Sequence, residues 1–235
     1  MSGAERAALL PSLLTVCALA VLLGLGAWQL DRHAEKQGLI AALASRLAGP
    51  MLATWDGLPA GEAEFRRATL SGIFLYDHEF RLLARPRGGR PGYHLVAPLR
   101  LDDGRIVLVD RGWMPETGGE AARPEGPVAV EGVLRRPPNP GWAGPENRPD
   151  AGQWLYIDPA AVARARGLAV EGDYYLMAAP TPHLQGPDGL PRGTAVTPEI
   201  RDDHLQYALT WCALALVLAV VYGLWLGRSD SASAQ

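Results

Sequence analysis

The stretch AALLPSLLTVCALAVLLGLGAWQL, Ala7 to Leu30, decides the architecture of this chain. It holds 24 residues without a formal charge and is bounded by Arg6 and Asp31. At a rise of about 1.5 Å per residue, a helix of this length spans roughly 36 Å, enough for a hydrocarbon core of about 30 Å. Pro11 falls in the first turn, where its missing N–H costs little. We therefore predict a transmembrane helix over residues 7–30.

The opposite end of the chain holds a second apolar run, LQYALTWCALALVLAVVYGLWLG. It occupies residues 205–227, between His204 and Arg228, and its 23 residues are too many for an ordinary core helix. A cleaved signal peptide is the alternative for the first run, with Ala18-Leu19-Ala20 as a possible cleavage site. That run continues for ten residues past Ala20 and follows a single basic residue, which favours an uncleaved anchor. We predict a second transmembrane helix over residues 205–227, so membrane lipid surrounds both anchors.

Charge and cysteine content narrow the remaining possibilities. The net charge is −3 and there is no basic block, so nucleic acid is not an expected partner. Cys17 and Cys212 both lie inside the apolar runs, so the connecting region has no thiol for a disulfide or a thiolate metal site. The connection of 173 residues exceeds the range of the positive-inside rule, and charge alone leaves the orientation open.

Residues 31–203 are predicted to form one β-rich domain outside the membrane. Leu39, Ile40, Leu43 and Leu47 lie on one helical stripe and indicate that a helix continues over residues 37–48. The pattern then changes to short strands, expected at 66–75, 80–85, 93–101, 105–111, 127–135, 153–157 and 173–179.

Turn and cap residues define the other elements of this domain. Asp102-Asp103-Gly104 is a tight turn that joins a hairpin from Val96 to Asp110. Asp158 as N-cap, Pro159 at the first helical position and Gly167 as the stop predict a helix over 159–166. Stretches rich in Pro and Gly predict loops at 114–127, 136–152 and 180–198. We predict an α+β membrane protein, with two terminal transmembrane helices flanking an antiparallel barrel-like or sandwich-like domain.

Catalytic signatures are missing from the sequence. It has no phosphate-binding glycine loop that opens a helix, no Gly-x-Ser-x-Gly and no His-Glu-x-x-His. His78, His94 and His183 have no ligand spacing and are interpreted as surface or structural histidines. In Arg111-Gly112-Trp113, we expect the strand to end in a glycine bend that packs the tryptophan ring on the sheet. These observations disfavour an enzyme.

His204 stands apart because it begins the second apolar run. Tyr207 and Trp211 follow it at i+3 and i+7, so all three share one helical face. They either form an interfacial belt, or His204 is an axial haem ligand beside an aromatic surface. Trp28 and Gln29 end the first run at about the same depth, where Gln29 either contributes to a site or hydrogen-bonds one helix to the other. Candidate cofactor-binding residues are therefore His204, Trp28, Gln29, Tyr207 and Trp211, with His204 as the only candidate metal ligand.

Six short segments, spread over nearly the whole chain, carry a family resemblance. They are Leu25-Gly26-Ala27-Trp28-Gln29-Leu30 with Arg32 and Lys36, Phe65 with Gly72 and Phe74, Gly92-Tyr93-His94-Leu95-Val96-Ala97-Pro98-Leu99, Val109-Asp110-Arg111-Gly112-Trp113-Met114-Pro115, Gly132-Val133-Leu134-Arg135, and Asp203-His204-Leu205-Gln206-Tyr207-Ala208-Leu209-Thr210-Trp211. In this order they resemble the motifs of the Surf1 family (Surf1/Shy1), the cytochrome c oxidase assembly factors. The chain departs from the family pattern at Glu35, Asp202-Asp203 and Cys212, where the family usually has an aromatic residue, an Asn pair and a phenylalanine.

The resemblance implies a function that the motifs alone do not reveal. It implies a protein of the bacterial inner membrane that helps place haem a in subunit I of the oxidase, with haem a synthase as a further possible partner. Its β-rich domain would be periplasmic and both termini cytoplasmic. Some members of the family bind haem a, and the histidine of the second anchor, here His204, would be the ligand. The alternative is a scaffold that holds subunit I and never holds haem.

Overall fold

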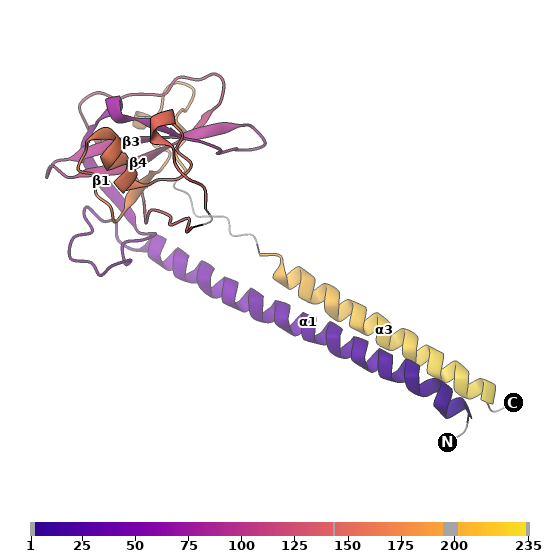
Figure 1. Ribbon diagram of the computed structural model, residues 1–235. Coiled ribbons are helices and arrows are strands. Elements are labelled where there is room, and N and C mark those ends of the chain that lie inside the picture. Colours follow the sequence, from indigo (N-terminus) through magenta and orange to yellow (C-terminus); the bar gives the residue numbers. More distant parts are fainter. Residues whose placement is uncertain (1–2, 143, 195–201, 234–235) are drawn as a thin grey trace. The chain divides into compact units, whose positions relative to one another are not determined.

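The computed structural model describes residues 3–142, 144–194 and 202–233 (Figure 1). The chain divides into two compact units. One unit contains the N-terminal residues up to Ala42 together with the C-terminal segment that begins at Glu199, and the other is Leu43–Pro198.

The first unit consists of two long apolar helices, the first of which continues for six residues into the second unit. Helix α1 runs from Gly3–Ala48 without a break, and α3 from His204–Ser233. Both are long and apolar enough to cross a membrane, and only 6% of each apolar stretch is buried within the protein. The predicted pair of terminal apolar helices is confirmed, as is the continuation of the first helix over residues 37–48.

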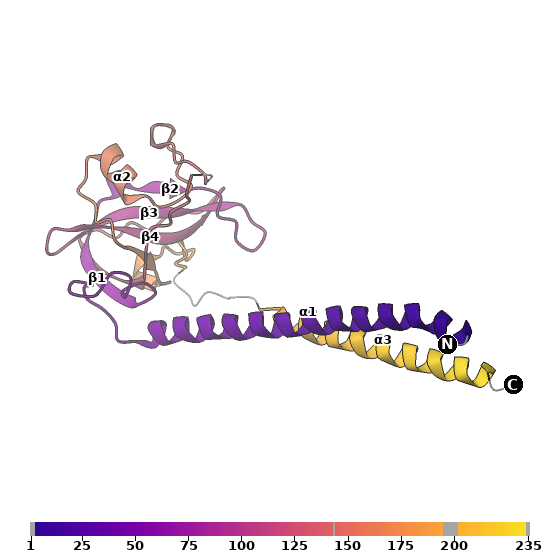
Figure 2. The same cartoon turned by 60° about the horizontal axis from the view of Figure 1, so that its bottom comes forward.

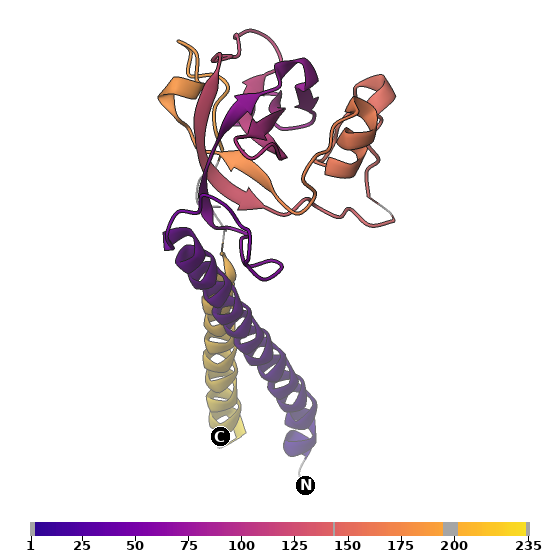
Figure 3. The ribbon, with the colours of Figure 1, turned by 90° about the vertical axis from the view of Figure 1, so that its left-hand side faces the viewer.

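The ribbons of helices α1 and α3 lie against each other over part of their length (Figure 3), and small residues meet where the two helices pack closely. A Cβ atom added to Gly26 would lie 3.3 Å from Sγ of Cys212 and 3.8 Å from the carbonyl oxygen of Ala208. Ala208 and Ala215 on α3 are 2% and 4% exposed. Small residues let the two backbones approach, as in helix pairs that associate within lipid.

The second unit is a β-barrel (Figure 2). Its strands are β1 (Arg67–Phe74), β2 (Phe80–Leu82), β3 (Gly92–Leu101), β4 (Ile106–Pro115), β5 (Pro127–Arg135) and β6 (Tyr175–Ala178). The strand order is β1-β5-β6-β4-β3-β2, and an additional pairing between β1 and β3 closes a five-stranded barrel, from which β2 extends as a sixth strand. The predicted β-rich barrel between two helices is therefore confirmed.

Apolar side chains from all five barrel strands form the principal core inside the barrel. This core includes Leu70, Leu99, Val109, Leu134 and Leu176, each exposed by 1% or less. A second cluster lies on the outer side of β3 and β4, where β2 and helix α2 (Pro159–Arg166) cover them. Helix α2 has the predicted limits, because Asp158 accepts the N–H of Ala161 at 2.9 Å and Gly167 ends the helix in the left-handed conformation.

Two predictions about the sheet were wrong. The sheet is mixed, since β4 and β6 are parallel, although every other strand pair is antiparallel. The strand predicted at 153–157 does not form: Trp154 makes one isolated bridge to Leu82, and Oδ1 of Asn147 accepts the N–H groups of Leu155 and Tyr156. A side chain thus takes the place of a neighbouring strand.

Strand limits and loops differ from the prediction in smaller ways. The strand expected at 80–85 ends at Leu82, and Ala84 just beyond it has a φ of 56°. Three short 3-10 helices lie at Tyr76–His78, Pro149–Ala151 and Pro182–Leu184, the last two within predicted loops. The final four residues of the loop predicted at 180–198 lie outside the described residues.

Strand β4 also continues past the predicted bend. Val96 pairs with Asp110 and Leu95 with Gly112, so Arg111 is an extra residue in a β-bulge. Gly112 has a φ of 120°, and a Cβ there would lie 2.2 Å from the carbonyl oxygen of Arg192. Glycine therefore permits the bulge, and the strand resumes to Pro115. The expected packing of the tryptophan is confirmed, since Trp113 is 5% exposed.

Candidate functional site

His204 is the first residue of α3, and two contacts hold it. Its backbone N–H donates to Oδ1 of Asp202 at 3.1 Å, and its ring atom Nδ1 lies 2.7 Å from Oε1 of Gln29 on α1. An amide oxygen only accepts hydrogen bonds, so the imidazole donates from Nδ1–H, and in the neutral ring the lone pair is then on Nε2. The structure thus brings together two of the predicted site residues, in a form of the ring that can bind a metal.

Asp202 links the start of α3 to a row of polar side chains on α1. Its Oδ2 accepts hydrogen bonds from Nδ1 of His33 at 2.7 Å and from Nε2 of Gln37 at 3.0 Å. Gln29, His33 and Gln37 are four residues apart and so follow one face of α1. His33 and Gln37 were missed from the sequence, although their spacing from Gln29 was a visible signal.

The three predicted aromatic residues differ in their surroundings. Trp28 is 50% exposed and Tyr207 is 56% exposed on the helix pair. Trp211 faces α1, with its Cβ 3.8 Å from the position of a Cβ added to Gly26. Its indole Nε1 is buried and has no hydrogen-bond partner among the residues that the structure describes. The helix pair therefore presents two exposed rings and one buried donor without an acceptor.

In the barrel, two of the segments singled out above are neighbouring strands. Gly92 pairs with Pro115, Tyr93 with Met114, and His94 with Trp113. The remaining motif residues also meet: the guanidinium of Arg135 lies 4.4 Å from the ring centre of Phe65, whose N–H donates to the carbonyl of Leu134 at 2.8 Å. In the β-domain, residues of these segments thus lie on paired strands or next to a strand end.

The bulge directs Arg111 into a buried ion pair. Nη1 of Arg111 lies 2.6 Å from Oε2 of Glu79, and these side chains are 3% and 5% exposed. Glu79 also binds Arg123 at 2.8 Å, and Arg111 donates to the carbonyl of Ala122. The Arg111 guanidinium lies 5.2 Å from the ring centre of Phe74. Losing one member of such a pair is costly because its partner stays buried and charged.

The other polar residues of these strands are also satisfied within the barrel. Nδ1 of His94 lies 2.8 Å from Oδ2 of Asp110, and Oδ1 of Asp110 accepts the N–H of Gly112 at 3.0 Å. The indole N–H of Trp113 donates to the carbonyl of Arg85 at 2.7 Å. Burial raises the pKa of the nearby Tyr175 to about 12, although Arg135 and Arg85 oppose the shift. These hydrogen bonds stabilise the barrel, which agrees with the interpretation of His94 as a structural histidine.

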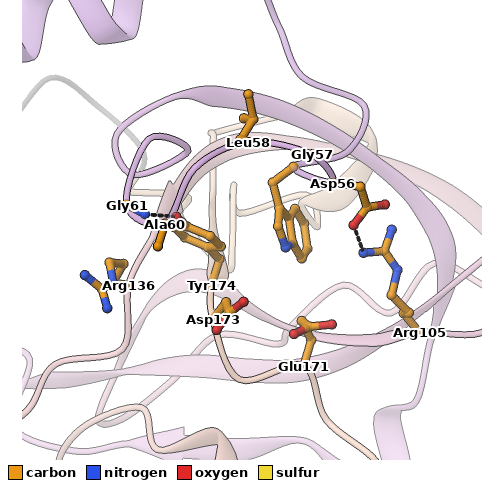
Figure 4. Close-up of a pocket in the computed structure, with 11 residues that line it drawn as sticks. Asp56, Gly57, Leu58, Ala60, Gly61, Arg105, Arg136, Glu171, Asp173 and Tyr174 are labelled. Atoms are coloured by element: carbon orange, nitrogen blue, oxygen red, sulfur yellow. Dashed lines mark hydrogen bonds and ion pairs between the residues drawn. The ribbon is translucent and has the colours of Figure 1, made fainter.

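Among the residues that the structure describes, two larger cavities open on the surface of the β-domain. One has a volume of about 310 Å³ and lies beside Trp55 and Tyr174 (Figure 4). At its edge, Arg105 binds Asp56 at 2.9 Å, and Tyr174 accepts the N–H of Gly61 at 2.9 Å. The other, of about 340 Å³, is lined by residues from β2, β3 and the loop after β4, including Arg81 and Tyr93. Neither contains a predicted site residue.

Across residues 3–142, 144–194 and 202–233, no three residues of the types His, Cys, Asp and Glu are grouped so as to hold a metal ion. A haem iron needs only one protein donor on a given side, and neutral imidazole is a standard one. His204 meets that requirement by its tautomer.

Comparison with known proteins supplies the family. Residues 16–216 match the model of the SURF1 family. The chain belongs to the SURF1 family. A SURF1-like protein of Rickettsia bellii is 30% identical, over 87% of this chain and 86% of that protein. The mouse protein Surfeit locus protein 1 is also 30% identical, over 86% of this chain and 71% of its own length. A SURF1-like protein of Drosophila melanogaster is 33% identical, over 86% and 73% respectively.

Membership in the SURF1 family confirms the resemblance that the six segments indicated. The family match extends from within α1 to within α3, so it includes part of each helix and the whole barrel.

Proposed function

We propose that this chain is an assembly factor for haem–copper cytochrome c oxidase, the role for which the SURF1 family is known. In this proposal it assists the insertion of haem a into subunit I and carries no catalytic activity of its own. The observation that carries the proposal is the contact of 2.7 Å between Nδ1 of His204 and Gln29, which leaves Nε2 as a donor.

The proposed location is the bacterial inner membrane. Residues 7–30 and 205–227 would cross it as part of α1 and α3, in contact with lipid. Residues 31–203 would lie on the periplasmic side, and both termini in the cytoplasm. The length and exposure of the apolar helices support the crossing, and the likeness to a bacterial SURF1-like protein supports the compartment.

The residues around His204 fit haem a as cargo. Its imidazole provides an axial donor, and the exposed rings of Trp28 and Tyr207 offer apolar surface for a flat macrocycle. The buried indole N–H of Trp211 lacks an acceptor among the described residues, and a polar substituent of the macrocycle would satisfy it. In this proposal, haem a synthase is a source of the haem and subunit I is its destination.

A scaffold that binds subunit I without holding haem is the second candidate. The hydrogen bond between Gln29 and His204 favours it, because the same contact joins two helices irrespective of any ligand. The rings of Trp28 and Tyr207 would then belong to an interfacial belt.

One paired experiment separates the two candidates. The protein is purified in detergent from cells that make haem a, its absorption spectrum is recorded, and the haem a content of the oxidase from the same cells is measured. For a haem carrier, His204→Ala removes or shifts the Soret band, leaves the protein in the membrane and lowers the haem a content of the oxidase. His183→Ala is the matched control, since His183 lies in the β-domain and hydrogen-bonds the carbonyl of Ala129. An unchanged spectrum with normal oxidase in His204→Ala would favour the scaffold.

A further inference from the structure

The geometry points to Gln29 as a positioning residue that acts on haem through His204. We infer that its amide oxygen, 2.7 Å from Nδ1, holds the proton on that nitrogen and turns the Nε2 lone pair toward the iron of an incoming haem. This inference rests on the proposed function, since it assumes that His204 is the ligand. It assigns Gln29 a role other than contact with the macrocycle or attachment of one helix to the other.

The contacts of His204 restrict both its backbone and its ring. Asp202 accepts the backbone N–H of His204, which fixes where α3 begins. Asp202 is itself held by His33 and Gln37 on α1, at 2.7 and 3.0 Å. The third residue of that row on α1, Gln29, then binds the ring. Hydrogen bonds therefore connect both the main chain of His204, through Asp202, and its side chain to α1. The ring has little freedom to turn.

Metal-bound histidines generally need such a partner. The hydrogen bond from the non-ligating nitrogen selects the tautomer, orients the ring and makes the imidazole a stronger donor. A carboxylate often plays this role in soluble proteins, as Asp202 does here toward His33. Gln29 lies one residue before the end of the predicted span, where a buried charge is costly. Its neutral amide supplies the hydrogen-bond acceptor without adding a charge.

The tautomer of His204 tests the inference without any haem. The full-length protein, labelled with ¹⁵N in its histidines, is studied by NMR in detergent at about pH 8, where an unperturbed imidazole is neutral. The signals of His204 are identified by their loss in His204→Ala. In the wild type we expect a protonated Nδ1 and a free Nε2, and in Gln29→Leu a loss of this preference. A wild-type ring protonated on Nε2, or the same tautomer in Gln29→Leu, would overturn the inference.

Haem binding supplies the second measurement. The purified apoproteins are titrated with haem a, and the Soret band is followed. We expect Gln29→Leu to bind on the order of ten- to a hundred-fold more weakly, the usual cost of losing the partner of a ligating histidine. Gln29→Glu keeps an acceptor and should restore most of the affinity. Gln206→Leu, which removes an exposed amide from α3, is the matched control and should bind like the wild type.

The outcomes separate the inference from the function on which it rests. Haem binding that is lost in His204→Ala but unchanged in Gln29→Leu would overturn the role of Gln29 and leave the proposed function standing. A wild-type protein that takes up no haem would overturn the proposed function, and the inference toward haem with it. Weak binding by Gln29→Leu, rescue by Gln29→Glu and the expected tautomer together would support both.

Discussion

Replacing Trp113 with alanine tests whether the motif residues of the barrel act through the stability of the fold. The indole is 5% exposed and packs in a cluster with Tyr93, Leu95, Met114 and Leu190. Truncation of a buried tryptophan to alanine typically costs about 3 to 5 kcal/mol. Loss of the 2.7 Å hydrogen bond to the carbonyl of Arg85 adds about 1 kcal/mol. Because domains are stable by only about 5 to 15 kcal/mol, Trp113→Ala should remove a large part of the stability of the barrel.

The assay is urea unfolding of the full-length protein in detergent, followed by near-UV circular dichroism, together with the protein level in membranes. Trp113→Phe is the control that keeps a six-membered aromatic ring and removes the pyrrole part of the indole with its N–H donor, so it should lose less, about 1 to 2 kcal/mol. We expect Trp113→Ala to lower the protein level more than the haem signal per molecule. An alanine variant that unfolds and accumulates like the wild type, yet fails to support oxidase assembly, would refute this reasoning and assign Trp113 to a partner contact.

Three further predictions concern other parts of the chain. Burial raises the pKa of Tyr175 from 10.0 to about 12. Its contribution to stability is therefore complete below pH 10 and is lost as the pH rises from 10 to 12, by about 1.4 kcal/mol per pH unit. Urea midpoints measured against pH should show this loss in the wild type and not in Tyr175→Phe. Asp158→Ala removes the acceptor for the N–H of Ala161 and should cost about 1 kcal/mol, measured by the same unfolding assay, whereas an unchanged midpoint would show that the cap contributes nothing. A reporter that is active only in the periplasm should work when fused near Gly118 and fail when fused after Gln235, and activity at the C-terminal fusion would contradict the proposed orientation.

Local signals in the sequence were sufficient for the helices. The apolar runs predict α1 and α3, and Asp158, Pro159 and Gly167 give the limits of α2 because caps act within one helical turn. The antiparallel hairpin of β3 and β4 was also predictable, since the turn at 102–104 lies between its two strands.

Contacts between distant segments were not predictable in this way. The parallel pairing of β4 with β6 joins Val109 to Leu176 across three intervening elements, and no local pattern encodes it. The bulge at Arg111 depends on the register of β3. The residue types at 153–157 favour a strand, but the side chain of Asn147 accepts a backbone N–H group there in place of a neighbouring strand. Tertiary packing decided each of these cases.

The candidate site shows the same division. The sequence placed Gln29 and His204 at about the same depth, because Gln29 lies near the end of the first apolar run, His204 lies at the start of the second, and both runs border one domain. It did not indicate the contact of Asp202 with His33, which depends on how α1 and α3 are rotated about their axes. Helical spacing gives the residues of a face but not the direction in which that face points.

Closure of the barrel restricts how another protein can bind to it. Strand β1 pairs with β5 on one side and β3 on the other, and Leu52 bonds to Arg67 and Thr69 on that second edge. Trp154 pairs with β2, and Arg192 pairs with β4 beyond β6. Within the described residues, these backbone partners occupy parts of the strand edges, which opposes β-augmentation and edge-to-edge aggregation there. In the proposed function, a partner that binds this domain would therefore contact mainly its side chains and loops.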